Sequence, residues 1–286
     1  MDDHPTIPAP LVHVFGVPIH QLTRKEVTDL CRLWLRGNSP RHIVTVNPEI
    51  LLRARTDDWF RTVITHADLV TADGIGIRWA SAFLRTVEAR GKRRRDVLVW
   101  FIRTLGAFFL KPQTIPSPIP ERVSGSDLLW DIAQEAAAAR ATVYLIGGRR
   151  QTALRAAEHL QKALPNLTIA VFAPDHVATP YPPYELHVAL ETKAPAVVFI
   201  GYGAPQQEEW IHQNLHRFPS IRIAMGVGGA LDFLAGNAPR APFQYQVRGL
   251  EWFWRLEHQP RRILRALRAT ILFPTILLLS RLRMFP

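Results

Sequence analysis

From residue 42 onward, short apolar runs alternate with longer segments in which apolar residues recur every three or four positions. The short runs are rich in β-branched residues and predict strands at 42–46, 68–72, 142–148, 167–174, 195–203 and 221–229. The periodic segments predict helices at 48–67, 124–141, 151–164 and 205–218. This alternation is typical of a mostly parallel sheet covered on both faces. We therefore expect a doubly wound, Rossmann-like α/β fold over residues 1–240.

Two segments depart from this alternation. Residues 86–118 contain the basic stretch "RGKRRR" and the apolar run "VLVWFIRTLGAFFL". Residues 241–286 are amphipathic and arginine-rich, and carry Trp252 and Trp254. We expect an insertion within the core and a basic helical appendage, both in contact with an anionic membrane surface. The alternatives are a hairpin that packs against the appendage, and a solvated arginine face over core tryptophans.

Neither apolar segment is expected to cross a membrane alone. The run at 97–110 carries Arg103, and the run at 269–280 carries Pro274. A helix of fourteen residues spans roughly 21 Å, against about 30 Å for a hydrocarbon core. The first ten residues, "MDDHPTIPAP", lack the basic and apolar regions of a signal peptide. We expect a peripheral membrane protein.

The charge balance points to an anionic partner. The chain has 286 residues, with 35 Lys and Arg against 24 Asp and Glu, which gives a formal net charge of +11. Nucleic acid, a membrane or a phosphorylated substrate would satisfy that charge. Because the basic residues cluster beside apolar runs rather than spreading along a groove, we expect lipid and no nucleic acid. The single cysteine, Cys31, excludes an internal disulfide and a cysteine-built zinc site.

Glycines follow four of the predicted strands, in "DGIG", "IGG", "GYGAP" and "GVGG". Ligands of open α/β sheets bind at the carboxyl ends of the strands, and glycine lets the backbone approach them. Any one of these turns is explained by turn chemistry alone. Together they predict a cleft for a phosphate or sugar nucleotide, with Gly147, Gly203 and Gly228 among its binding residues.

Polar side chains at the strand ends are candidates for chemistry, although each has a structural alternative. Asn47 precedes Pro48 and is a standard helix N-cap. Asp73 could cap a helix from residue 75, and Gln207 is a favoured first-turn residue. Thr45 is not explained by capping. Glu208, His212 and His216 share one helix face, which is typical of a solvated face rather than a zinc site.

Three common nucleotide-site motifs are absent from the sequence. There is no P-loop, no strict G-x-G-x-x-G after a strand, and no D-x-D pair to hold a metal under a diphosphate. The missing dinucleotide fingerprint weighs against a sugar-nucleotide epimerase or dehydrogenase, which stays the main alternative. A basic nucleic-acid-binding protein is a weaker one.

The motifs "TVNPEI", "ADLVTADGIGIRWA", "RVSGSDL", "YLIGG", "FIGYGAPQQEEW", "GVGGALDFLAG", "RAP" and "GLEWFWRLEHQPRR" occur in a recognisable order. Together they resemble the WecG/TagA/CpsF glycosyltransferases, glycosyltransferase family 26, over roughly residues 10–265. The resemblance implies an inverting, metal-independent enzyme without cofactors. It would move a sugar from a UDP-sugar to a polyprenyl-diphosphate-linked sugar on the cytoplasmic membrane face, for surface polysaccharide or teichoic acid. The donor sugar could be N-acetylmannosamine, its uronic acid or glucose. The segment 86–118 departs from typical members.

The resemblance also implies roles for single residues. Asp73 would be the catalytic base, and Thr45 and Asn47 would position the reacting sugar. Gln207 and the appendage arginines would hold the donor; these arginines are Arg255, Arg262 and Arg265. The appendage would dock on the membrane, and homo-oligomerisation could hide the site. Independent chemistry agrees, because a lone carboxylate can take the acceptor proton and arginines can neutralise a departing diphosphate.

Overall fold

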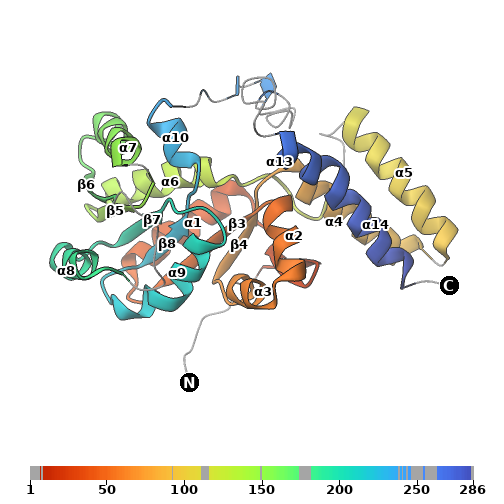
Figure 1. The fold of residues 1–286 in the computed structure, drawn as a ribbon, viewed down its shortest axis with the longest axis horizontal. Coiled ribbons are helices and arrows are strands. Elements are labelled where there is room, and N and C mark those ends of the chain that lie inside the picture. Colours follow the sequence, from red (N-terminus) through yellow and green to blue (C-terminus); the bar gives the residue numbers. More distant parts are fainter. Residues whose placement is uncertain are drawn as a thin grey trace.

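The fold is built on one parallel sheet of six strands in the order β4-β3-β8-β7-β5-β6 (Figure 1). The computed structural model describes residues 7, 9–91, 93–110, 116–148, 150–173, 182–237, 239, 241–242, 244–245, 254 and 263–284. The strands are β3 (Arg41–Val46), β4 (Leu69–Ala72), β5 (Thr142–Ile146), β6 (Thr168–Phe172), β7 (Val197–Ile200) and β8 (Ile223–Gly226). All six lie within or beside the predicted runs. The predicted parallel sheet is therefore confirmed.

Helices cover both faces of this sheet, which confirms the doubly wound arrangement. They are α1 (Arg24–Arg36), α2 (Pro48–Thr56), α3 (Asp58–Thr65), α4 (Ile75–Arg90), α6 (Gly125–Ala138), α7 (Arg150–Ala163), α8 (Tyr184–Lys193), α9 (Gln206–Asn214) and α10 (Ala230–Leu234). Successive strand residues point to opposite faces. Val143 and Leu145 accordingly join one hydrophobic cluster with α1, α6 and α7, whereas Tyr144 and Ile146 join another with α8 and α9.

The predicted helix at 48–67 is two helices, α2 and α3. The break falls at Asp57, whose carboxylate accepts a hydrogen bond of 3.0 Å from the Phe60 N–H and so caps α3. The N-terminal part, which the apolar pattern left unassigned, forms an antiparallel hairpin of β1 (Leu11–Val14) and β2 (Val17–His20), followed by α1. A capping box between Thr23 and Glu26 starts α1.

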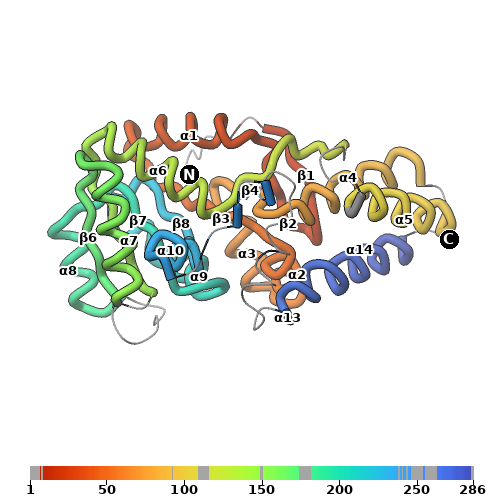
Figure 2. Tube along the Cα trace, turned by 90° about the horizontal axis from the view of Figure 1, so that it is seen from above, coloured from red at the N-terminus to blue at the C-terminus, as the bar shows by residue number. Residues whose placement is uncertain are grey.

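The insertion at 86–118 forms α5 (Arg94–Leu110), which lies beside α4 and α14 at one end of the molecule (Figure 2). An aromatic cluster holds α5 on α4: the ring of Trp79 stacks on Phe83 at 5.7 Å, and Phe101 meets both rings edge-on. One face of α5 thus packs against α4 and against α14 of the appendage, which agrees with the alternative of a hairpin packed on the appendage. Its opposite face is exposed at Leu98, Val99 and Ile102.

The described C-terminal part of the appendage forms one continuous helix from Ile263 to Leu282. It is built from α13 (Ile263–Leu267), a π-helical turn (Arg268–Leu272) and α14 (Phe273–Leu282). By length and composition it could cross a membrane, so the expectation that no segment is long enough is wrong. Pro274 does not end the helix, because the preceding turn widens and the Phe273 N–H bonds to the Arg268 carbonyl. Of the two tryptophans, Trp254 is 9% exposed, as in the alternative of core tryptophans, and Trp252 lies outside the described residues.

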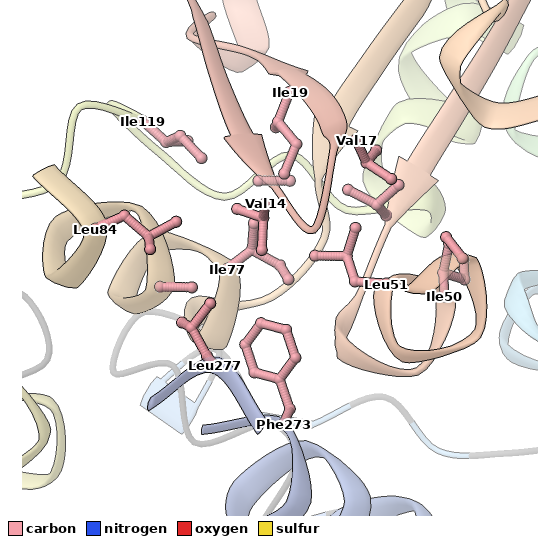
Figure 3. Packing of buried hydrophobic residues seen from close by; sticks show 14 of the residues in the cluster. Val14, Val17, Ile19, Ile50, Leu51, Ile77, Leu84, Ile119, Phe273 and Leu277 are labelled. Atoms are coloured by element: carbon pink, nitrogen blue, oxygen red, sulfur yellow. The ribbon is translucent and has the colours of Figure 1, made fainter. Parts of the chain in front are cut away.

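Phe273 and Leu277 tie the appendage to the core. Both are almost fully buried among Val14, Leu51 and Ile77 of the hairpin, α2 and α4 (Figure 3). The C-terminal helix therefore shares a hydrophobic cluster with the α/β core, and a domain boundary near residue 240 stays a prediction.

Replacing Phe273 by Ala should lower the free energy of unfolding by about 3–5 kcal/mol, because it removes a fully buried ring and leaves a cavity. Urea unfolding followed by circular dichroism measures the change. Leu279→Ala on the same helix is the control, since Leu279 is 51% exposed and should cost at most about 0.5 kcal/mol. Equal losses for the two variants would contradict the anchoring role of Phe273.

Candidate active site

A cleft of about 1670 Å³ opens at the carboxyl ends of the strands. Its walls come from the segments that follow β3, β4, β5, β7 and β8, which is where ligands of open α/β sheets bind. The predicted residues that line it are Thr45, Asn47, Asp73, Gly203, Gln207, Gly228 and Arg265. Residues spread over more than 200 positions of the chain thus meet in one cavity.

Thr45, Asn47 and Asp73 are brought together by the pairing of β3 with β4. Val46 pairs with Ala72, and the Asp73 N–H donates to the Val46 carbonyl at 2.8 Å. Asn47 and Asp73 therefore leave neighbouring strands at the same level. Thr45 is 9% exposed, and Gly125 at the start of α6 lies so close that an added Cβ would be 2.9 Å from the Thr45 hydroxyl.

Asn47 occupies a helix N-cap position, whereas Asp73 does not. The Asn47 side-chain oxygen accepts from the Ile50 N–H at 3.0 Å, so Asn47 caps α2, with Pro48 at the first helical position. The N-cap residue of α4 is Gly74, whose φ of 120° favours glycine, so Asp73 lies one residue before the cap. Asp73 lines the cleft directly after a buried strand.

Gln207 joins two glycine turns of the cleft wall. Its side-chain oxygen accepts from the Gly203 N–H at 3.0 Å and from the Gly228 N–H at 3.1 Å. Its amide nitrogen donates to Glu208 at 2.8 Å, and Glu208 contacts the His42 ring nitrogen at 3.1 Å. Since Gln207 is 5% exposed, it positions the turns rather than offering a free amide to a ligand.

This network corrects one expectation from the sequence. Glu208 is 1% exposed and paired with His42, so it does not belong to a solvated helix face. The helical face also ends early, because α9 stops at Asn214 and His216 lies in a following 3-10 turn. Among the described residues, no group of three His, Cys, Asp or Glu side chains is arranged to hold a metal ion.

Replacing Gln207 by Ala should reduce both stability and turnover. The change removes the acceptor of two partly buried backbone N–H groups and one of the partners of Glu208, which costs about 1–3 kcal/mol of unfolding free energy. Thermal unfolding measures the first effect, and steady-state kinetics measure the second. Gln206→Ala is the matched control, because Gln206 is the exposed neighbour on the same turn of α9. If both variants behave like the wild type, Gln207 does not position the turns.

Several lining residues were not singled out from the sequence. They are Arg53, Gln151, Thr152, Arg155, Tyr202, Asp232, Asn237 and Arg268. Gln151 and Thr152 lie in the first turn of α7, directly after a glycine turn. That position in the sequence could have indicated that they line the cleft. Gly148 lines the cleft, and the predicted Gly147 does not. Gly147 lies against the Tyr202 ring, which a Cβ added to Gly147 would overlap. Arg255 and Arg262 lie outside the described residues.

The electrostatics of the cleft suit a diphosphate. The N-termini of α2, α6, α7 and α9 all contribute lining residues, and helix N-termini carry partial positive charge. Arg265 and Arg268 extend from the C-terminal helix into the same cavity. Arg265 forms an ion pair of 3.7 Å with Glu49, both partly exposed to solvent. Such a pair is worth only about 0–1 kcal/mol and can be exchanged for a bound phosphate.

The sequence profile of the Glycosyl transferase WecG/TagA/CpsF family matches residues 12–107 and 97–285. One similar protein is the N-acetylglucosaminyldiphosphoundecaprenol N-acetyl-beta-D-mannosaminyltransferase of Bacillus spizizenii strain W23. It is 27% identical over 251 residues, covering 86% of this chain and 84% of the relative. A protein of the same name from Staphylococcus aureus strain MRSA252 is 27% identical over 246 residues, covering 85% and 83%.

Proposed function

The chain belongs to the WecG/TagA/CpsF family of glycosyl transferases, and from this premise we propose its donor, acceptor and mechanism. The donor is a UDP-sugar of the N-acetylmannosamine type, and the acceptor is a sugar on a polyprenyl diphosphate. The names of the relatives support N-acetylmannosamine and an N-acetylglucosaminyl-diphosphate lipid. The uronic acid of N-acetylmannosamine and glucose are the next donors to test.

One observation carries the mechanism: the Asp73 carboxylate lines a cleft into which two arginines of the C-terminal helix also extend. Asp73 takes the proton of the acceptor hydroxyl as that oxygen attacks the anomeric carbon. The bond from that carbon to the UDP oxygen breaks on the opposite face, so the configuration inverts. Thr45 and Asn47 lie beside Asp73 and position the reacting sugar.

Arginines take the place of a metal in this proposal. The leaving UDP carries the negative charge of its diphosphate, and bidentate guanidinium contacts can neutralise it. Arg265 and Arg268 supply these contacts from the described part of the helix, and Arg255 and Arg262 are further candidates. We therefore expect transfer to continue in EDTA.

The acceptor lipid explains the exposed apolar side of the C-terminal helix. Ile263, Leu264 and Ile271 are each at least half exposed, on the same helix that carries the cleft arginines. The proposal places this helix against the cytoplasmic face of the membrane, held to the core by Phe273. Homo-oligomerisation stays a prediction.

A UDP-release screen tests this function. Each UDP-sugar is offered with and without an N-acetylglucosaminyl-diphosphate-prenyl acceptor, in the presence of EDTA. We expect UDP release with one donor, dependent on the acceptor. Conversion of a donor without acceptor or UDP release would instead support an epimerase or dehydrogenase, and overturn the proposal.

A further inference from the structure

A second, smaller pocket of about 440 Å³ lies between α4 and α5, away from the cleft. Its described lining consists of Arg85, Thr86, Ala89, Arg90, Trp100, Arg103, Thr104, Ala107 and Pro116. Three of these side chains are arginines, and none of the described lining residues is acidic. The volume falls within the range of sites that bind small ligands.

Trp100 contacts two of the arginines. The guanidinium carbon of Arg90 is 5.2 Å from the centre of its ring, and that of Arg103 is 5.3 Å away. Cation–π contacts hold both guanidiniums at the pocket without using up their hydrogen-bond donors. The donors of Arg90 and Arg103 therefore stay available for an anion.

The nearby carboxylates are engaged elsewhere. Glu88 of α4 forms an ion pair of 3.6 Å with Arg281 of α14, and Asp96 of α5 accepts from the Arg93 N–H at 3.0 Å. In the described part of the chain, Arg85, Arg90 and Arg103 have no carboxylate partner. Three such charges around one pocket repel one another unless an anion joins them.

The pocket is separate from the catalytic cleft. Arg85 and Arg90 follow the start of α4 by ten and fifteen residues, which places them about 15–22 Å along the helix from its N-terminus, next to Asp73. No described residue lines both cavities. The donor diphosphate held near Arg265 cannot also fill this pocket.

The neighbouring face of α5 indicates the kind of anion. Trp100, Arg103 and Ala107 follow one stripe of the helix. Val99, four residues before Arg103, is exposed beside that stripe, and Leu98 and Ile102 continue the exposed apolar surface around the helix, with Ile102 68% exposed. A soluble anion would not contact the exposed apolar side chains, whereas a phospholipid presents a phosphate and acyl chains side by side. Tryptophan beside arginine is also typical of the membrane interface.

We propose that the α4–α5 arginine pocket binds the headgroup phosphate of an anionic phospholipid, whose acyl chains lie along the exposed apolar surface of α5. The insertion at 86–118 then anchors the enzyme to the bilayer at a point of its own, beside the C-terminal helix (Figure 2). This inference goes beyond the proposed transfer reaction and does not depend on the donor sugar.

Flotation of the full chain with vesicles tests the proposal. Vesicles of phosphatidylcholine alone are compared with equal mixtures of phosphatidylcholine and phosphatidylglycerol. The double variant Arg85→Gln/Arg103→Gln should bind the mixed vesicles about 30-fold more weakly than the wild type, at about 1 kcal/mol for each charge near the surface. Binding to phosphatidylcholine alone should change little.

The matched control is Arg93→Gln/Arg95→Gln, which removes two exposed charges at the same end of the molecule but outside the pocket. An equal loss of binding to the mixed vesicles in both double variants would show that the basic surface as a whole attracts the anionic lipid. That result would overturn the pocket site. The pocket site would also be overturned if the pocket variant bound the mixed vesicles as tightly as the wild type does. This holds whether or not that variant loses binding to inorganic phosphate or to duplex DNA.

A second assay separates this inference from the proposed function. Transfer to a short-chain, detergent-dispersed acceptor should be the same in the pocket variant and the wild type, because the pocket lies outside the cleft. Normal vesicle binding without transfer in the wild type would reject the proposed function and leave the lipid site standing. Normal transfer with unchanged vesicle binding in the variant would reject the lipid site alone.

Discussion

Replacing Asp73 by Asn is expected to lower kcat by about 10²–10⁴-fold and to leave UDP-sugar binding nearly unchanged. The amide has almost the same shape as the carboxylate but cannot accept the proton of the acceptor hydroxyl. Since Asp73 follows β4 outside the helix cap, the change should also leave α4 intact. Steady-state kinetics and UDP titration by calorimetry measure the two quantities.

Asp232→Asn is the comparison for this variant, because Asp232 is another carboxylate of the same cleft. We expect Asp232→Asn to keep most of the turnover. A severe loss in Asp232→Asn with full turnover in Asp73→Asn would move the role of base to Asp232. Loss of UDP binding in Asp73→Asn would instead assign Asp73 to donor binding.

The double variant Arg265→Ala/Arg268→Ala should lower kcat/KM by about 10²–10⁴-fold. Each guanidinium contact to the diphosphate is worth about 1.5–3 kcal/mol, and about 1.4 kcal/mol corresponds to tenfold in rate. The free energy of unfolding should change little, since Arg265 is mostly exposed and its pair with Glu49 is weak. Kinetics with a detergent-dispersed acceptor exclude effects on membrane binding.

Two further variants sharpen this prediction. Arg265→Lys/Arg268→Lys keeps the charge but loses the bidentate geometry, so it should recover only part of the activity. Arg281→Ala/Arg283→Ala removes two charges from the other end of the same helix, outside the described lining of the cleft, and should keep wild-type kinetics in detergent. Equal losses in all three would point to helix displacement rather than to diphosphate contacts.

The parallel sheet was predictable because its strands are buried on both faces. β4, β7 and the part of β3 from Ile43 onward are unbroken apolar or β-branched runs that end in polar or glycine-rich turns. The N-terminal hairpin was missed because each strand has four residues and β2 contains Pro18, which weakens any strand pattern. The continuous helix through Pro274 was missed because proline usually ends a helix, and the π-helical turn that accommodates it has no sequence signal.

The site was predictable as far as strand ends define it. Parallel strands bring their carboxyl ends to one edge, so Thr45, Asn47 and Asp73 could be grouped from the sequence. The setting of Gln207 was not predictable, because its neighbour Glu208 pairs with His42, which is 166 positions away in the chain. Only the folded sheet brings Glu208 and His42 together, and no local sequence pattern predicts their contact.

Mass spectrometry of the lipid-linked product tests the central claim most directly. The full chain is incubated with UDP-N-acetylmannosamine and an N-acetylglucosaminyl-diphosphate-prenyl acceptor in EDTA, beside its Asp73→Asn variant. We predict that the wild type extends the acceptor by the mass of one N-acetylhexosamine, and that the variant forms only traces of this product. An acceptor left unextended by the wild type with every UDP-sugar, or extended equally by both proteins, would contradict the account.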